Sequence, residues 1–176
     1  MIDLLFLETG NGGDCQLVNQ RFAEAMSFEN MPFFAMFGGN PGEETTNTRL
    51  EDEQKFDWWG NTSLLNESKG AQFNSKTEFA LNNEPLNSNG RKRIEEAVKS
   101  DLKFMQDFAE ITVNVVILDF EKVQINIELI QPNNIQERKF IYIWDGFRLI
   151  DETISVIPLP SSLTEGLNEF LNYELT

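Results

Sequence analysis

Histidine is absent from this sequence, and cysteine occurs only once, as Cys15. Without histidine there is no imidazole to act as the base of a Ser–His or Cys–His catalytic pair. A zinc site built from cysteine and histidine is excluded for the same reason, and a lone cysteine cannot form a disulfide within the chain. These absences remove many of the common catalytic and metal-binding classes.

Basic residues are also scarce. The chain has 14 Lys and Arg against 29 Asp and Glu, which gives a formal net charge of -15 at pH 7. This charge repels the phosphate backbone of nucleic acids and anionic membrane surfaces, so we expect no nucleic acid as a partner. The simplest role of the excess acid is solubility, and any partner needs basic or apolar patches.

Long hydrophobic runs are missing as well. No stretch approaches the roughly 18 apolar residues of a membrane-spanning helix, and residues 1–6 lack the basic region of a secretory signal. We expect no membrane insertion, and synthesis in the cytoplasm. With 176 residues, of which 40% are hydrophobic, the chain is large and apolar enough to form one domain with a core.

The first half of the sequence carries weak structural signals. Apolar residues predict a strand at 2–7, closed by a Gly/Asn turn, and a second strand at 15–21. Residues 31–37 fit either a buried strand or an apolar turn of helix, and we favour the strand. Residues 40–75 have the composition of a long irregular connection, interrupted by an aromatic cluster at 56–61.

The second half carries stronger signals. Apolar residues at three-and-four spacing predict an amphipathic helix over 90–108, with Ser88 or Asn89 as N-cap. A shorter helix is expected over 76–83, ended by Pro85.

Alternating apolar residues then predict strands. Two of them, at 111–117 and 123–129, are joined by a tight turn, and a third at 138–144 places its aromatic side chains on one face. The remaining residues, 147–176, continue apolar through Ile157, break at a Pro-Leu-Pro sequence and end in a helix opened by a capping box at 162–165. The expected fold class is α+β: an antiparallel sheet of three or more strands packed by one long amphipathic helix, with a long loop and a C-terminal helical extension.

This order of parts resembles the small baseplate-wedge proteins of Mu-like contractile-tailed phages and prophages. The resemblance covers residues 1–146 and rests on the Gly13-Asp14 turn, the Trp58-Trp59-Gly60 element, the amphipathic helix and the strand pair, ending near Trp144. The chain departs from the wider wedge family at 106–111, where the sequence Gln-Asp-Phe-Ala-Glu-Ile replaces the usual Glu-Pro-Arg triplet.

The resemblance implies a role in virion assembly. It predicts a structural subunit of a phage-type contractile tail baseplate that binds other baseplate, sheath or tube proteins. Such a subunit would stay in the bacterial cytoplasm before assembly and then become part of the phage tail particle. Residues 1–146 would form the wedge-like domain, and 147–176 would be an extension packed on it.

Seven residues are candidates for contacts with partners. Trp58 and Trp59 are adjacent, so in an extended segment one could enter the core while the other faces a neighbour, although both could equally pin their loop to its own domain. Gly60 would supply the turn that presents them, and Trp144 is a further aromatic anchor. The other three candidates are charged: Arg91, Arg93 and Asp101.

The charged candidates also have structural explanations. Arg91 and Arg93 flank Lys92 in the only basic run, at the expected start of a helix, where the helix dipole disfavours positive charge. Either a partner compensates them, or the helix begins earlier than predicted. Asp101 falls within the apolar stripe, so it needs a donor or a subunit contact unless it lies at a water-exposed helix edge, which we favour.

We expect no catalytic residues, cofactor or metal site. The alternative function is a peptidoglycan-type glycoside hydrolase of the tail tip that uses paired carboxylates between Glu43 and Asp57, although no spacing there defines such a pair. A stand-alone bacterial binding module on the same fold is a third possibility, since fold does not determine function.

Overall fold

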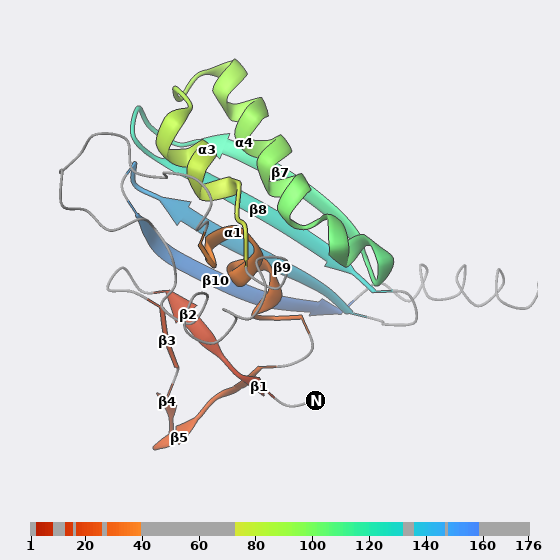
Figure 1. Cartoon of the computed structure of the whole chain (residues 1–176). Helices are drawn as coiled ribbons and strands as arrows, with labels where there is room; N and C mark the ends of the chain where they lie inside the picture. The colour runs from red at the N-terminus through yellow and green to blue at the C-terminus, as the bar shows by residue number, and fades with distance from the viewer. Residues whose placement is uncertain are drawn as a thin grey trace, which may run out of the picture.

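The computed structural model describes residues 3–8, 13–15, 17–25, 28–39, 73–131, 136–146 and 148–158. These residues form a mixed α/β fold around a four-stranded antiparallel sheet in the order β10-β9-β8-β7. Helices α3 and α4 lie across one face of the sheet, as Figure 1 shows. The main elements are α1 (Met31–Phe37), α3 (Thr77–Asn83), α4 (Ser88–Asp101), β7 (Glu110–Ile117), β8 (Val123–Ile130), β9 (Gln136–Trp144) and β10 (Leu149–Pro158).

The sheet confirms the predicted strand pair and third strand. In β8, buried and half-buried residues alternate along the whole strand, because successive side chains point to opposite faces of the sheet. The inward residues of β8 and β9 form the centre of the core with Val113 and Val115 of β7. A fourth strand, β10, pairs with β9 and lies within the segment 147–176 that the sequence analysis treats as an extension. The helix expected from position 162 lies outside the described residues.

The long helix has different limits from those predicted. α4 begins at Ser88, and its N-cap is Asn87, whose Oδ1 accepts hydrogen bonds from Asn89 N and Gly90 N at 2.9 and 3.0 Å. It ends at Asp101 and is followed by the 3₁₀ helix η2 (Lys103–Asp107), so the expected continuous helix to 108 is wrong. The apolar periodicity continues through both helices, and for this reason it did not reveal the change.

A close approach explains the glycine near the start of α4. A Cβ atom at Gly90 would lie 1.9 Å from Pro85 O. Only glycine permits this turn between α3 and α4. The shorter helix, α3, is confirmed, and it ends two residues before Pro85.

The expected strand at 31–37 is wrong, because this segment is helix α1. Pro32 lies in the first helical turn, where its missing N–H is not needed for an intrahelical bond. Pro32, Ala35 and Met36 are buried at three-and-four spacing, which is the pattern of a helix face. The run is too short and too uniformly apolar for the sequence alone to distinguish helix from strand.

The N-terminal residues form short antiparallel pairs. The predicted first strand is divided into β1 (Asp3–Leu4) and β2 (Phe6–Glu8), which pair with β6 (Glu24–Ala25) and β3 (Gly13–Cys15) respectively. The predicted second strand at 15–21 is wrong as a single strand, because the chain reverses within it. Its parts are the end of β3, then β4 (Leu17–Val18) and the start of β5 (Arg21–Phe22). Among the described helices, none is both long and apolar enough to cross a membrane.

Candidate protein-interaction site

The β4–β5 hairpin exposes three large apolar side chains. Leu17 pairs with Phe22 across the two strands, and Leu17, Val18 and Phe22 keep 63%, 50% and 57% of their surface exposed. Asn19 and Gln20 form the turn with φ angles of 52° and 64°, the left-handed values that a two-residue type I′ turn requires. The hairpin projects away from the sheet at the lower left of Figure 1. A two-stranded hairpin is marginally stable in water, so apolar residues here favour contact with another surface.

Hydrogen bonds hold the N-terminal strands next to this hairpin in place beside α1. The Asn30 side chain, next to α1, accepts a hydrogen bond from Phe6 N at 3.1 Å and donates one to Leu4 O at 2.6 Å. Leu5 N donates to Ala23 O at 2.9 Å, just after the hairpin. Asn30 is itself buried, so these bonds satisfy a buried amide and hold the N-terminal strands in place. The hairpin is therefore presented from a defined position.

Trp58, Trp59 and Gly60, the predicted aromatic element, lie outside the described residues. The two flanks of their loop, however, are described and lie together. Ser75 N donates a hydrogen bond to Gly39 O at 2.9 Å, which closes the stem from which residues 40–72 leave and return. The role of the tryptophans in a contact remains a prediction.

Trp144 belongs to the core. It is 2% exposed, and its ring stacks on Phe37 of α1 with centroids 6.4 Å apart and an interplanar angle of 10°. A residue this buried cannot anchor a partner at the surface, so its expected role as a surface anchor is corrected. The structure assigns it to packing between α1 and the sheet.

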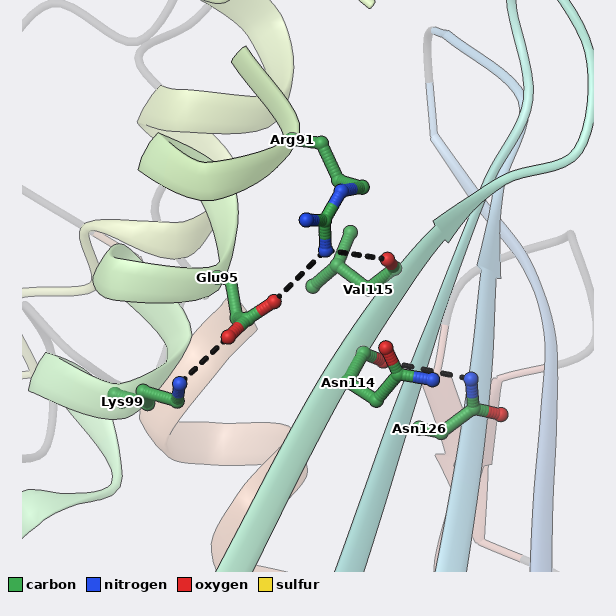
Figure 2. Close-up of polar contacts among 6 residues, drawn as sticks. All are labelled: Arg91, Glu95, Lys99, Asn114, Val115 and Asn126. Atoms are coloured by element: carbon green, nitrogen blue, oxygen red, sulfur yellow. Dashed lines mark hydrogen bonds and ion pairs between the residues drawn. The ribbon is translucent and has the colours of Figure 1, made fainter. Parts of the chain in front are cut away.

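Arg91 and Arg93 are paired within the chain. Because α4 begins at Ser88, Arg91 is at the end of its first turn and Arg93 lies in the second, which supports the structural explanation of an earlier helix start. Arg91 Nη1 donates to Glu95 Oε2 at 3.0 Å and to Val115 O of β7 at 3.3 Å, as Figure 2 shows. Arg93 pairs with Glu84 at 3.0 Å. Their involvement with a partner remains a prediction.

Glu95 lies at the centre of this charged row on α4. Lys99 Nζ approaches Glu95 Oε1 at 2.6 Å on the side opposite Arg91 (Figure 2). The hydrogen bond from Lys99, with a further contribution from Arg91, lowers the pKa of the Glu95 carboxyl. The row connects α4 to the backbone of β7, the edge strand that α4 covers.

Asp101 caps α3. Its carboxylate accepts hydrogen bonds from Lys76 N at 2.9 Å, from Thr77 N at 2.8 Å and from Thr77 Oγ1 at 2.7 Å. The carboxylate thus has donors within the chain, and the exposed helix edge that we favoured is wrong. Burial raises the pKa of the Asp101 carboxyl, although the hydrogen bonds oppose this shift. The geometry explains this residue without a partner.

Two hollows lie among the described residues. One, of about 420 Å³, lies beside α1, α3 and η2 and is lined in part by Ala35, Phe73 and Phe104. The other, of about 300 Å³, lies on the sheet face opposite the helices and is lined mainly by polar side chains such as Asn126 and Lys139. Two carboxylates, including that of Glu128 at 2.7 Å, pair with Lys139 and raise the pKa of its ammonium. The second hollow is therefore a solvated polar surface.

The alternative hydrolase function stays a prediction. Positions 43–57, where the hydrolase would have its acids, lie outside the described part of the chain. Burial raises the pKa of the Glu78 carboxyl well above its ordinary value, as expected for a general acid, but Glu78 is only 3% exposed and a substrate cannot reach it. Across the described residues, no group of three His, Cys, Asp or Glu is placed to hold a metal ion.

Sequence reasoning did not identify the β4–β5 hairpin as a site. Its turn residues, Asn19 and Gln20, lack the glycine that usually marks a type I′ turn, so the segment was predicted as a single strand. The available signal was the polar Asn-Gln pair between apolar residues. That pattern is weak without knowing that the strands are exposed.

Three comparisons with known proteins identify no relative. The chain matches no protein-family model, and neither curated proteins nor solved structures give a significant match. The resemblance to baseplate-wedge proteins therefore rests on the sequence elements described above.

Proposed function

We propose that this protein is an assembly subunit that acts through protein–protein contacts, and that the assembly is the baseplate of a phage-type contractile tail. The proposal of an assembly subunit is supported by the anchored β4–β5 hairpin, which exposes Leu17, Val18 and Phe22. The proposal that the assembly is a contractile-tail baseplate follows from the resemblance in sequence. The partners would be other baseplate, sheath or tube proteins, met in the bacterial cytoplasm and retained in the tail particle.

The hairpin offers enough apolar surface for a specific but modest contact. Full burial of one such side chain contributes about 1.5–3 kcal/mol, and each of the three is roughly half exposed, so on the order of 1 kcal/mol per residue is available. Ordering costs reduce this gain, since the side chains lose rotamer freedom on binding. A subunit held only by this hairpin would bind weakly. Further contacts are therefore part of the proposal.

The additional contacts would come from two other segments. The loop 40–72, with Trp58 and Trp59, leaves from the stem closed by Ser75 and Gly39, and aromatic residues are frequent anchors of interfaces. The proposed C-terminal helical extension follows β10 and would give a third point of attachment. Three attachments on one subunit multiply weak affinities when they engage together.

Capture of the tagged chain from its producing cells tests the proposal. The wild-type protein should retain baseplate, sheath or tube proteins, identified by mass spectrometry, and Leu17→Ser with Phe22→Ser should lose them. The matched control is Leu118→Ser with Phe120→Ser, because these turn residues are 47% and 76% exposed at a different place. Equal loss in both variants, or no tail protein in any sample, would refute the assignment.

The aromatic loop is tested separately. Trp58→Ala with Trp59→Ala should weaken the same capture without reducing the amount of folded protein. Retention at the wild-type level would remove the loop from the proposed contacts, while the hairpin would still be judged by its own variant.

A further inference from the structure

We propose that the segment 159–176 packs as an amphipathic helix across the end of the sheet, beside Val156 and Phe108 of the same chain. The contact goes beyond the proposed function because it lies within one copy and involves no partner. Three features support it: the position at which β10 ends, the apolar surface at that end of the sheet, and the sequence of the segment itself.

The strand β10 ends at the same end of the sheet at which β7 begins. Pro158 pairs with Gln136 at the start of β9, and the next residue, Glu137, pairs with Ile130 of β8. Ile130 in turn pairs with Glu110, the first residue of β7, which follows η2. In Figure 1 the tip of β10 and the C-terminal end of α4 lie together at the right. The chain therefore leaves Pro158 three strand spacings, or about 14 Å, from the start of β7.

Apolar side chains at this end of the sheet are partly open to water. Val156 of β10 pairs with the buried Arg138, so it points to the face of the sheet that the helices cover, yet it is 44% exposed. Phe108, two residues before β7, is 54% exposed, and its ring contacts the half-buried Phe28 with centroids 6.0 Å apart. Val156 and Phe108 thus lie at the two sides of one strand end, with the buried Leu129 and Arg138 on the strands between them.

Arg138 is a buried cation without a carboxylate partner among the described residues. It is 6% exposed, its Nη1 donates to Gln131 Oε1 at 3.0 Å, and its Nε has no hydrogen-bond acceptor. Buried donors of this kind normally have acceptors. The segment 159–176 begins three residues after Val156, the strand partner of Arg138, and it contains three glutamates and no Lys or Arg. It therefore brings acceptors and negative charge to the place where this guanidinium lacks them.

The sequence of the segment predicts a helix that needs a surface to pack on. Helical spacing places four apolar residues on one face: Leu163, Leu167, Phe170 and Leu171. Gly166 weakens the helix from within, and a helix of about ten residues is not stable alone in water. A helix over 162–171 would be about 15 Å long, which matches the distance of about 14 Å from β10 to β7.

The short connection to β10 limits which surface the helix can reach. Residues 159–161 span at most about 10 Å when fully extended, so the end of the sheet is the first surface available to the helix. The polar side of the helix, which includes Glu165 and Asn172, would face outward. The packed segment would therefore still offer an attachment to a basic surface of a partner.

Hydrogen–deuterium exchange of the purified full chain, measured by mass spectrometry, tests the contact. In the wild type, the amides of residues 163–171 should exchange at least about tenfold more slowly than in a free peptide of the same sequence. The rate should not change with protein concentration, because the contact lies within one copy. Phe108→Ser with Val156→Ser should abolish this protection while the amides of α4 stay protected. Leu167→Ser with Phe170→Ser should abolish it from the other side of the contact.

The control is Leu118→Ser with Phe120→Ser, which removes two exposed apolar residues at the opposite end of the sheet and should leave the protection unchanged. Should α4 lose protection in the double variant of Phe108 and Val156, Val156→Ser alone decides in the same way. The contact is overturned by a wild type without protection at 163–171, by protection that survives these substitutions, or by protection that grows with concentration. The proposed function is judged separately, by capture of baseplate proteins.

Discussion

Replacing Asp101 with alanine removes the group that joins the end of α4 to the start of α3. Three donors lose their acceptor: the backbone N–H groups of Lys76 and Thr77, and the hydroxyl of Thr77. Thr77 is fully buried, so water cannot replace the lost acceptor for its hydroxyl. The perturbation therefore combines the loss of a helix cap with an unsatisfied buried group.

The expected loss of stability follows from these two terms. A lost N-cap interaction costs about 0.5–2 kcal/mol, and an unsatisfied buried donor costs about 1–3 kcal/mol. Burial raises the pKa of the Asp101 carboxyl, so holding it ionised in the folded state carries a cost that alanine removes. We therefore expect a net decrease of about 2 kcal/mol in the free energy of unfolding, and roughly half of this for Asp101→Asn, which keeps one acceptor oxygen.

Urea denaturation at neutral pH measures this decrease. The matched control is Ser100→Ala, since Ser100 is exposed, neighbours Asp101 and accepts a hydrogen bond only from the flexible Lys76 ammonium at 3.2 Å. Its effect should stay within about 0.5 kcal/mol. If Asp101→Ala were no more destabilising than Ser100→Ala, the capping interaction would contribute nothing and the reasoning would be refuted.

Three further predictions concern stability. Burial raises the pKa of Glu78 above its ordinary value of 4.5, so the protonated form is favoured on folding, and the associated stability is lost as the pH rises through the folded-state pKa. Glu78→Gln should thus gain stability relative to wild type as the pH rises above the ordinary carboxyl value of 4.5, and urea midpoints that stay the same distance apart at every pH would contradict this. Gly90→Ala should cost about 1–3 kcal/mol because its Cβ would meet Pro85 O; an unchanged melting temperature would show that the turn can open. Met36→Ala should cost about 2–5 kcal/mol, whereas Met31→Ala, on the exposed side of α1, should cost far less; similar losses would contradict the helical packing of this segment.

The sheet could be predicted from the sequence because its strands follow a strict alternation. Val123, Ile125, Ile127 and Leu129 are separated by polar or half-buried residues, and all four are buried. Periodicity of this kind reports directly which side chains face the core. The three-and-four periodicity likewise identified the buried face of α4, whose residues Ile94 and Val98 are fully buried.

Elements that depend on tertiary contacts could not be predicted in this way. The sequence Met31–Phe37 is apolar at nearly every position, so its burial in a helix follows from packing against Phe73, Tyr142 and Trp144 rather than from local pattern. The partner of Asp101 lies 24 or 25 positions earlier in the chain, beyond any local signal. The exposure of the hairpin is likewise a property of the folded chain.

The closed stem at Gly39 and Ser75 has a consequence for evolution. The bond that closes it joins backbone atoms of Ser75 and Gly39, so it uses no side chain of residues 40–72. For a chain whose two ends are already held together, added length carries only a slowly growing entropic cost. Insertions, deletions and rapid sequence change are therefore tolerable in this segment at little expense to the sheet and its register. Such a protein can acquire new partners through one segment while its core sequence remains under separate selection.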